Sequence, residues 1–400
     1  MSDSEILFEV KSGLGVITLN RPKALNAITL GMIREMEKVV PDWERDPAIK
    51  AVILRGAGDR AFCAGGDVAG LYREMRDDPQ GTLRRDFFYE EYIVNRRIYR
   101  YAKPWISLID GIDMGGGVGF SVHGSHSVAS EKFLFAMPET TIGLFPDVGG
   151  GYFLTRLPGA LGTFLALTSH RLKAANALWA GIVDAYVPSA RIDALQDALG
   201  AADLSGPDAQ RKVDKVIAGF AEDAGMPSLP AMMRDIDGCF SAETLQEIEA
   251  NLEKLGGEWA AKQLAALRKL SPLSMAITLE QLKRCANRSF EDVMTIEYRM
   301  SQACMIEGHD FFEGVRALRW LGLGLPLVFA IWILHGIAMS IFDAALLVRA
   351  TLVSLVVNVA ANLWLIPAWH RDGAAAATVL GEAVAFVLLA TTLARRLRHR

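Results

Sequence analysis

Short apolar runs typical of β-strands alternate with longer helical patterns in the first half of this 400-residue chain. One such helical pattern is Leu30–Val40. Strands that alternate with helices favour an α/β fold. The expected strands are Ile6–Val10, Leu14–Leu19, Ala51–Arg55, Ile106–Ile109 and Ile182–Val187.

The strand signals stop after about Ser189, and helical patterns follow. Ser289-Phe290-Glu291-Asp292 is typical of a helix N-cap followed by an acidic residue. We therefore expect an α/β core over residues 1–190 and a helical region over residues 191–318. Apolar residues in that region repeat at helix spacing at Leu245, Ile248, Leu252 and Leu255.

The composition changes near residue 318. Residues 1–318 contain 35 Lys and Arg and 43 acids, whereas residues 319–400 contain seven Arg, no Lys and three acids. Three nearly uncharged runs, 321–342, 350–369 and 374–394, are each long enough to span a bilayer. We expect residues 319–400 to form hydrophobic transmembrane helices, and a buried helical hairpin is the alternative.

The topology of such a tail is not straightforward. The Arg-rich end 395–400 is expected to stay in the cytoplasm, so three spans would place Leu318 outside and two would place it inside. Either one run is not inserted or the tail is an accidental fusion, which we favour. The acidic N-terminus is typical neither of a secretory signal nor of a transit peptide, so we expect a cytoplasmic catalytic domain anchored by the tail.

The net charge and the cysteine content argue against a nucleic-acid-binding protein and against a disulfide-rich fold. The formal net charge of −4 provides no overall basic surface for nucleic acid. The four Cys are scattered, with no C-x-x-C pair, which indicates free thiols rather than a disulfide framework.

Two glycine-rich turns follow predicted strands, at Ala61–Asp67 and Gly111–Gly119. At a strand-to-helix turn, free backbone N–H groups face the ligand, and glycine lets it approach closely. Two such turns could direct two amides at one oxygen and form an oxyanion hole. Tight turns that serve packing alone are the alternative.

Glu139 and Asp147 stand eight residues apart in an otherwise apolar, glycine-rich stretch. A carboxylate in such surroundings is either functional or satisfied by caps and Arg partners. Solvated loop acids are the simpler alternative.

Together these motifs resemble the crotonase (enoyl-CoA hydratase/isomerase) superfamily over residues 5–318. The resemblance implies a crotonase-like spiral of β-β-α units with a C-terminal helical region, an acyl-CoA substrate, and a homo-oligomer. The matching segments are Leu19–Ala27, Ala61–Asp67, Gly115–Gly117, and Pro138-Glu139 followed by Gly149-Gly150.

The resemblance also implies roles for single residues. The amides of Gly66 and Gly116 would bind the thioester oxygen, and the Ala64 carbonyl would bind the adenine amino group. Lys23 would meet the CoA phosphates, for which a Lys suits as a point charge. No metal and no separate cofactor are implied, because CoA is part of the substrate.

Position 119 separates the branches of the superfamily. Hydratases hold a water with two glutamates, at the positions of Gly119 and Glu139, and Gly119 has no carboxylate. The remaining pattern is similar to the 3-hydroxyisobutyryl-CoA hydrolase branch, which acts in valine catabolism. The similar stretches are Glu90–Tyr92, Met114–Gly124, Phe135–Leu154 and Gly308–Ala317.

That branch implies substrate contacts at Glu91, Gly116, Glu139 and Asp147. Glu139 would either attack the thioester, giving a mixed anhydride, or act as general base on water. Asp147 would orient the substrate hydroxyl or the water and share a proton with Glu139. Glu91 would bind the hydroxyl group at the acyl end of the substrate. The alternatives are another hydratase/isomerase-type reaction, or a membrane protein with an inactive CoA-binding module.

Two further expectations concern histidines and the tail. His123, His126 and His309 are expected to be structural or to lie at the surface. Residues 362–367 and 373–382 resemble the last helices of polysaccharide flippases, but the fragment is too short for a transport path, and we expect no transport.

Overall fold

The computed structural model describes residues 4–78, 80–306, 310–311 and 315, and parts of the segment 353–391. The chain divides into two compact units, Met1–Asp310 and Phe311–Arg400. Each unit is described by itself below.

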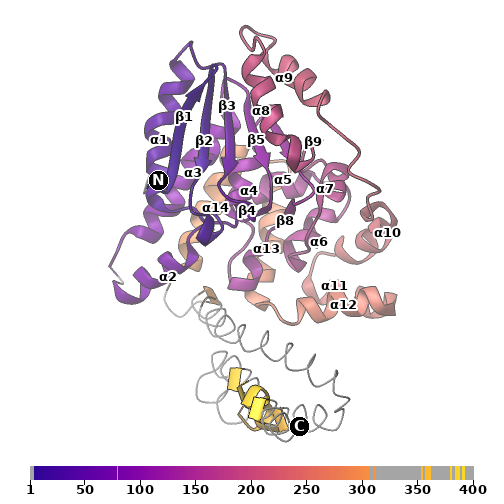
Figure 1. Cartoon of the computed structure of the whole chain (residues 1–400). Helices are drawn as coiled ribbons and strands as arrows, with labels where there is room; N and C mark the ends of the chain where they lie inside the picture. The colour runs from indigo at the N-terminus through magenta and orange to yellow at the C-terminus, as the bar shows by residue number, and fades with distance from the viewer. Residues whose placement is uncertain are drawn as a thin grey trace, which may run out of the picture. The chain divides into compact units, whose positions relative to one another are not determined.

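The first unit is built on two β-sheets (Figure 1). The large sheet has the order β1-β2-β3-β5-β7-β9, in which β1 is antiparallel to β2 and the other pairs are parallel. A small parallel sheet has the order β4-β6-β8. The strands are β1 (Ile6–Lys11), β2 (Leu14–Leu19), β3 (Ala51–Gly56), β4 (Ala61–Cys63), β5 (Trp105–Ile109), β6 (Ile112–Met114), β7 (His126–Ala129), β8 (Leu134–Ala136) and β9 (Ala185–Tyr186).

The chain visits both sheets in each turn of the fold, because β3, β5 and β7 of the large sheet are followed by β4, β6 and β8 of the small one. The predicted α/β class and the spiral of β-β-α units are therefore confirmed. The α-helices and short 3-10 helices (η) of this part of the chain are η1 (Pro22–Ala24), α1 (Leu30–Arg45), α2 (Val68–Asp77), α3 (Leu83–Arg100), α4 (Gly116–Ser121), η2 (Glu139–Ile142), α5 (Gly150–Phe153), η3 (Leu154–Arg156), α6 (Leu161–Thr168), α7 (Ala174–Ala180) and η4 (Ser189–Arg191).

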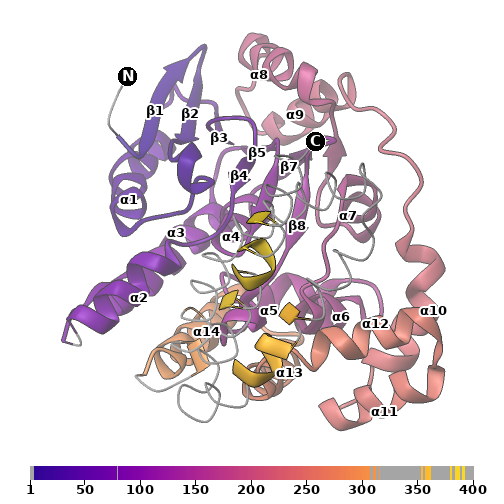
Figure 2. The same cartoon turned by 60° about the horizontal axis from the view of Figure 1, so that its bottom comes forward.

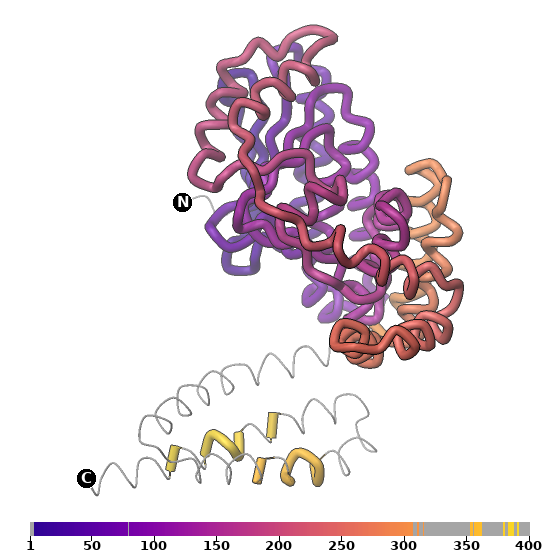
Figure 3. Tube along the Cα trace, turned by 90° about the vertical axis from the view of Figure 1, so that its right-hand side faces the viewer, coloured from indigo at the N-terminus to yellow at the C-terminus, as the bar shows by residue number. Residues whose placement is uncertain are grey.

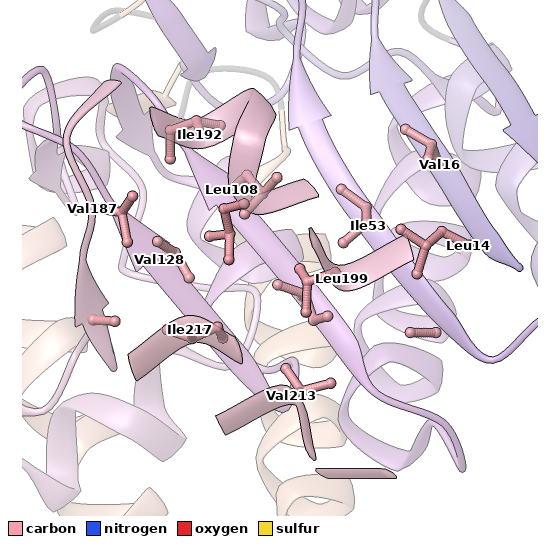
Figure 4. Packing of buried hydrophobic residues seen from close by; sticks show 14 of the residues in the cluster. Leu14, Val16, Ile53, Leu108, Val128, Val187, Ile192, Leu199, Val213 and Ile217 are labelled. Carbon is pink, nitrogen blue, oxygen red and sulfur yellow. The ribbon is translucent and has the colours of Figure 1, made fainter. Parts of the chain in front are cut away.

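Helices α8 (Ile192–Ala201) and α9 (Ala209–Ala218) cover one face of the large sheet. Figure 4 shows the core between these helices and the sheet, where Leu199, Val213 and Ile217 of the helices pack against strand residues. Burial of this apolar area stabilises the sheet at roughly 25 cal/mol per Å². The strand residues of this core include Leu14, Val16, Ile53, Leu108 and Val128.

The remaining helices group at one end of the unit (Figures 2 and 3). Helix α14 begins after Ser289, whose side chain accepts a hydrogen bond from the Asp292 N–H, so the predicted N-cap is confirmed. Helices α13 and α14 pack against α5 and thereby contact the segment that follows Glu139. These helices are α10 (Leu229–Phe240), α11 (Leu245–Leu255), α12 (Gly257–Leu267), α13 (Pro272–Cys285) and α14 (Phe290–Cys304).

In the second unit, the described residues of segments 353–361 and 379–391 are helical. Within the part of the chain that the structure describes, no helix is long and apolar enough to cross a bilayer. The predicted run 321–342 lies outside the described residues, and runs 350–369 and 374–394 are described only in part. His309 also lies outside the described residues.

Candidate active site

The two glycine-rich turns meet at one edge of the small sheet. Strands β4 and β6 are parallel neighbours, so the turns after them leave from the same edge. A Cβ built on Gly116 would lie 3.3 Å from the Gly66 nitrogen, and one built on Gly65 would lie 3.7 Å from the Gly116 nitrogen. The predicted pairing of Gly66 and Gly116 therefore has a geometric basis.

The N–H groups of Gly66 and Gly116 are available to a ligand. Gly116 is the first residue of α4, where the N–H has no partner within the helix. Around Gly66, the hydrogen bonds to Ile28 use the Gly65 carbonyl and the Asp67 N–H. Among the described residues no hydrogen bond uses either N–H, and two free donors on neighbouring turns are what an oxyanion hole requires.

Glycine is required in these turns by two close approaches. A Cβ on Gly116 would lie 2.7 Å from Glu91 Oε1, and a Cβ on Gly115 would lie 3.0 Å from Glu139 Oε1. Gly115 also has a φ of +52°, which residues with side chains rarely adopt. A side chain at Gly115 or Gly116 would thus crowd the Glu139 or the Glu91 carboxyl group.

Three carboxyl side chains converge on these turns from separate elements. Glu91 comes from α3, Glu139 is the first residue of η2, and Asp147 lies in the loop before α5. Their exposed fractions are 1%, 5% and 7%, so the interpretation of Glu139 and Asp147 as solvated loop acids is wrong. All three line one pocket together with Gly66 and Gly116.

No side-chain cation of the described residues forms an ion pair with this cluster. Among the ion pairs of the described residues, none involves Glu91, Glu139 or Asp147. Burial, reinforced by the other carboxyls, raises the pKa of Glu91 and of Glu139 well above its usual range. Burial therefore favours the protonated form of both glutamates.

Asp147 has a side-chain hydrogen-bond donor beside it. Burial raises the pKa of Asp147 to about 6, and a hydrogen bond from the Tyr92 hydroxyl opposes that rise. The Tyr92 hydroxyl lies 2.7 Å from Asp147 Oδ2. By contrast, Glu91 Oε1 and Glu139 Oε2 are buried without a hydrogen-bond partner among the described residues, which leaves them for a ligand.

The space beside Gly119 is filled. A Cβ on Gly119 would lie 2.5 Å from Val148 Cβ and 2.9 Å from Asn95 Nδ2. A glutamate side chain therefore has no room at this position, quite apart from its absence in the sequence.

The two predicted CoA contacts, Ala64 and Lys23, belong to neighbouring segments. Ala64 lines the pocket, and its N–H donates to the Leu25 carbonyl at 3.0 Å. Lys23 is exposed, two residues before Leu25. This hydrogen bond holds the Lys23 segment beside the Ala64 turn, an arrangement compatible with one extended ligand.

The histidines near the turns have structural partners. His123 Nε2 lies 2.7 Å from the Val148 carbonyl oxygen, and burial lowers the pKa of His123 to about 4. His126 Nε2 lies 3.2 Å from Asp214 Oδ1. Neither ring lines the pocket.

Sequence reasoning assigned no role to Tyr92, Gln281 or Glu297. Tyr92 directly follows Glu91 and carried no separate signal. Glu297 lies on the buried face of α14, at helical spacing from Phe290, Val293 and Ser301. An acid at a buried helical position is the signal that could have drawn attention to it.

The chain matches the family described as Enoyl-CoA hydratase/isomerase over residues 14–319. It therefore belongs to this family, the crotonase superfamily, as the motifs predicted. It is 49% identical over 320 residues to 3-hydroxyisobutyryl-CoA hydrolase, mitochondrial, of Rattus norvegicus, covering 79% of this chain and 82% of the relative. The corresponding protein of Homo sapiens is 47% identical over 319 residues, covering 78% and 81%.

Two solved structures share the fold closely. One is a carnitinyl-CoA dehydratase from Mycobacterium thermoresistibile, with a TM-score of 0.74, 39% identity, and coverage of 79% of this chain and 90% of that one. The other is an enoyl-CoA hydratase from Rhodobacter sphaeroides, with a TM-score of 0.72, 38% identity, and coverage of 79% and 89%. Their names describe addition or removal of water, whereas the names of the curated relatives describe hydrolysis.

Proposed function

We propose that this protein hydrolyses 3-hydroxyisobutyryl-CoA to 3-hydroxyisobutyrate and CoA. The observation that carries this proposal is that Glu139 and Asp147 line one pocket with Gly66 and Gly116, while Val148 fills the space beside Gly119. The identity of 47–49% to curated hydrolases over about four fifths of the chain supports it.

The glycine amides polarise the thioester. Its carbonyl oxygen lies between the N–H groups of Gly66 and Gly116, which stabilise the negative charge that develops when the carbonyl carbon is attacked. One such donor is worth about 3 kcal/mol in the transition state.

Glu139 supplies the nucleophilic step by one of two routes. In the first, its carboxylate attacks the carbonyl carbon, the C–S bond breaks and CoA leaves as a thiolate. Water then hydrolyses the mixed anhydride, which restores the Glu139 carboxylate, and a proton of that water goes to the CoA thiolate. In the second, Glu139 takes a proton from a water molecule whose oxygen attacks the carbonyl carbon, the C–S bond breaks, and Glu139 returns the proton to the leaving thiolate. Both routes need Glu139 ionised, and burial opposes that state.

Asp147 and Glu91 complete the proposed site. Asp147 exchanges a proton with Glu139 and orients the water or the acyl hydroxyl, with the Tyr92 hydroxyl fixing its carboxyl. The unpartnered Glu91 Oε1 accepts a hydrogen bond from the hydroxyl at the acyl end. This acceptor would favour 3-hydroxyacyl thioesters over plain acyl thioesters.

Hydration of an enoyl-CoA is the second candidate, because a hydratase structure is 38% identical to this chain. The deciding experiment compares release of free thiol from 3-hydroxyisobutyryl-CoA with hydration of crotonyl-CoA by the same preparation. Hydrolysis should be the faster reaction. Hydration that outpaces thiol release would refute the hydrolase assignment, and absence of both would favour an inactive binding module.

For the tail we propose membrane attachment without a role in the chemistry. The support is the three nearly uncharged runs of the sequence and the exposure of Val353, Val356 and Val359 in the described part. A cytoplasmic location of the catalytic unit remains a prediction, and the names of the curated relatives include the word mitochondrial. Recovery of the full chain without detergent, as one monodisperse species, would contradict attachment.

A further inference from the structure

The loop Pro146–Gly151, which carries Asp147, is held by two buried side chains of the helical region. Glu297 of α14 is fully buried and accepts the Gly149 N–H at 2.7 Å and the Gly151 N–H at 2.8 Å. Gln281 of α13 donates to the Pro146 carbonyl at 2.6 Å and to Glu297 Oε1 at 3.0 Å. The backbone is thus fixed on both sides of Asp147.

The same loop has a strained backbone. Val148 has a φ of +50°, a conformation that a β-branched residue rarely adopts and that persists only where the surroundings hold it. A hydrogen bond between the His123 ring and the Val148 carbonyl adds a third attachment. Without these attachments, the loop would relax toward an ordinary conformation and Asp147 would move.

From these contacts we infer that Glu297, assisted by Gln281, is a positioning residue that holds the Asp147 carboxyl in place for the reaction. The inference rests on the proposed thioester hydrolysis. Glu297 does not line the pocket and acts only through the loop. A buried carboxylate is suited to this task because both of its oxygens can accept N–H groups from the two glycines.

Glu297→Gln tests the inference with little change in volume. An amide has one accepting oxygen, so either the Gly149 or the Gly151 N–H would face an NH₂ group. We expect kcat for thiol release to fall about 10- to 100-fold, as for displacement of a reacting group by about 1 Å, while KM changes little. Gln281→Met removes the attachment at Pro146 and should lower kcat in the same way but less.

A double-mutant comparison separates positioning from general damage. If Glu297 acts through Asp147, Glu297→Gln should change kcat less than about threefold when Asp147→Asn is already present. Asp237→Asn is the matched control, because Asp237 of α10 also accepts a loop N–H, from Ala160 at 2.8 Å, outside the pocket. This control should leave kcat unchanged in both backgrounds.

Two results would overturn the inference. One is that Glu297→Gln lowers kcat by the same factor in the wild-type and the Asp147→Asn backgrounds. The other is that Glu297→Gln raises KM at constant kcat. If Glu297→Gln does not fold, Gln281→Met in the same two backgrounds decides.

An inactive wild type would count against the proposed hydrolysis alone. Amide hydrogen exchange at Gly149 and Gly151 would then decide, because Glu297→Gln must accelerate it if the loop is held as described.

Discussion

Replacement of Asp147 by Asn should slow the enzyme and stabilise its fold. The substitution keeps the shape of the side chain, and the Tyr92 hydroxyl can still donate to the amide oxygen. It removes a charge that is 93% shielded from solvent and has no cationic partner among the described residues. We expect kcat to fall by about 10²-fold or more, because the carboxyl no longer exchanges a proton with Glu139.

The gain in stability follows from the pKa of Asp147. Burial raises this pKa from 3.8 to about 6, which corresponds to a cost of about 3 kcal/mol for folding with the ionised group. Because the folded-state pKa is the higher one, the wild type keeps its full stability below pH 3.8 and loses this amount as the pH rises through about 6. The variant avoids the loss.

Denaturant unfolding at two pH values measures the effect. The free energy of unfolding of Asp147→Asn should exceed that of the wild type by up to about 3 kcal/mol at pH 7.5, and by much less at pH 4.5. Asp237→Asn, outside the pocket, should show no such pH-dependent gain. If the variant is less stable than the wild type at pH 7.5, Asp147 is a satisfied structural carboxylate and our account of the site is wrong.

Four further changes have defined expectations. Glu139→Gln should lower thiol release by about 10³-fold or more with binding preserved, since an amide neither attacks nor takes a proton, and single-turnover kinetics with a binding assay check this. Tyr92→Phe removes the donor that lowers the pKa of Asp147, so the acid limb of the kcat/KM profile should move to higher pH. Gly115→Ala adds a methyl group 3.0 Å from Glu139 Oε1 at positive φ and should lower kcat about 10-fold or more, measured at saturating substrate. Truncation after Leu318 should retain thiol release, and its complete loss in a folded protein would assign the tail a part in the active enzyme.

The sequence predicted the longer strands of the fold and missed most of the short ones. The predicted strand Ile182–Val187 contains the two-residue strand β9 but is four residues too long. Strand β2 was predicted over its observed range, and β1, β3 and β5 to within one residue at either end, because each is an apolar run that pairs within the buried sheet. Strands β4, β6 and β8 have three residues each, too few for a periodic pattern. The four-residue strand β7 was also missed, because it begins with His126 and Ser127, which are polar yet buried.

The candidate site was predicted from motifs rather than from periodicity. Gly66, Gly116, Glu91, Glu139 and Asp147 all reach one pocket, although their individual roles remain proposals. The supporting residues could not be derived in the same way. Tyr92 and Glu297 act through contacts across 55 and about 148 residues of sequence, and such pairings follow only from the folded chain.

Val148 lies both in the strained loop Pro146–Gly151 and against Gly119, the position that distinguishes hydratases from hydrolases. Its left-handed backbone places its side chain against Gly119, where a second water-holding glutamate would otherwise project. A single substitution Gly119→Glu should therefore not create a hydratase, because the new side chain would collide with Val148 and with Asn95. Relaxing Val148 to make room would shift Asp147, its neighbour in the same loop. A glutamate at position 119 would thus require a different shape of this backbone segment, which the buried hydrogen bonds of Glu297 and Gln281 hold in its present one.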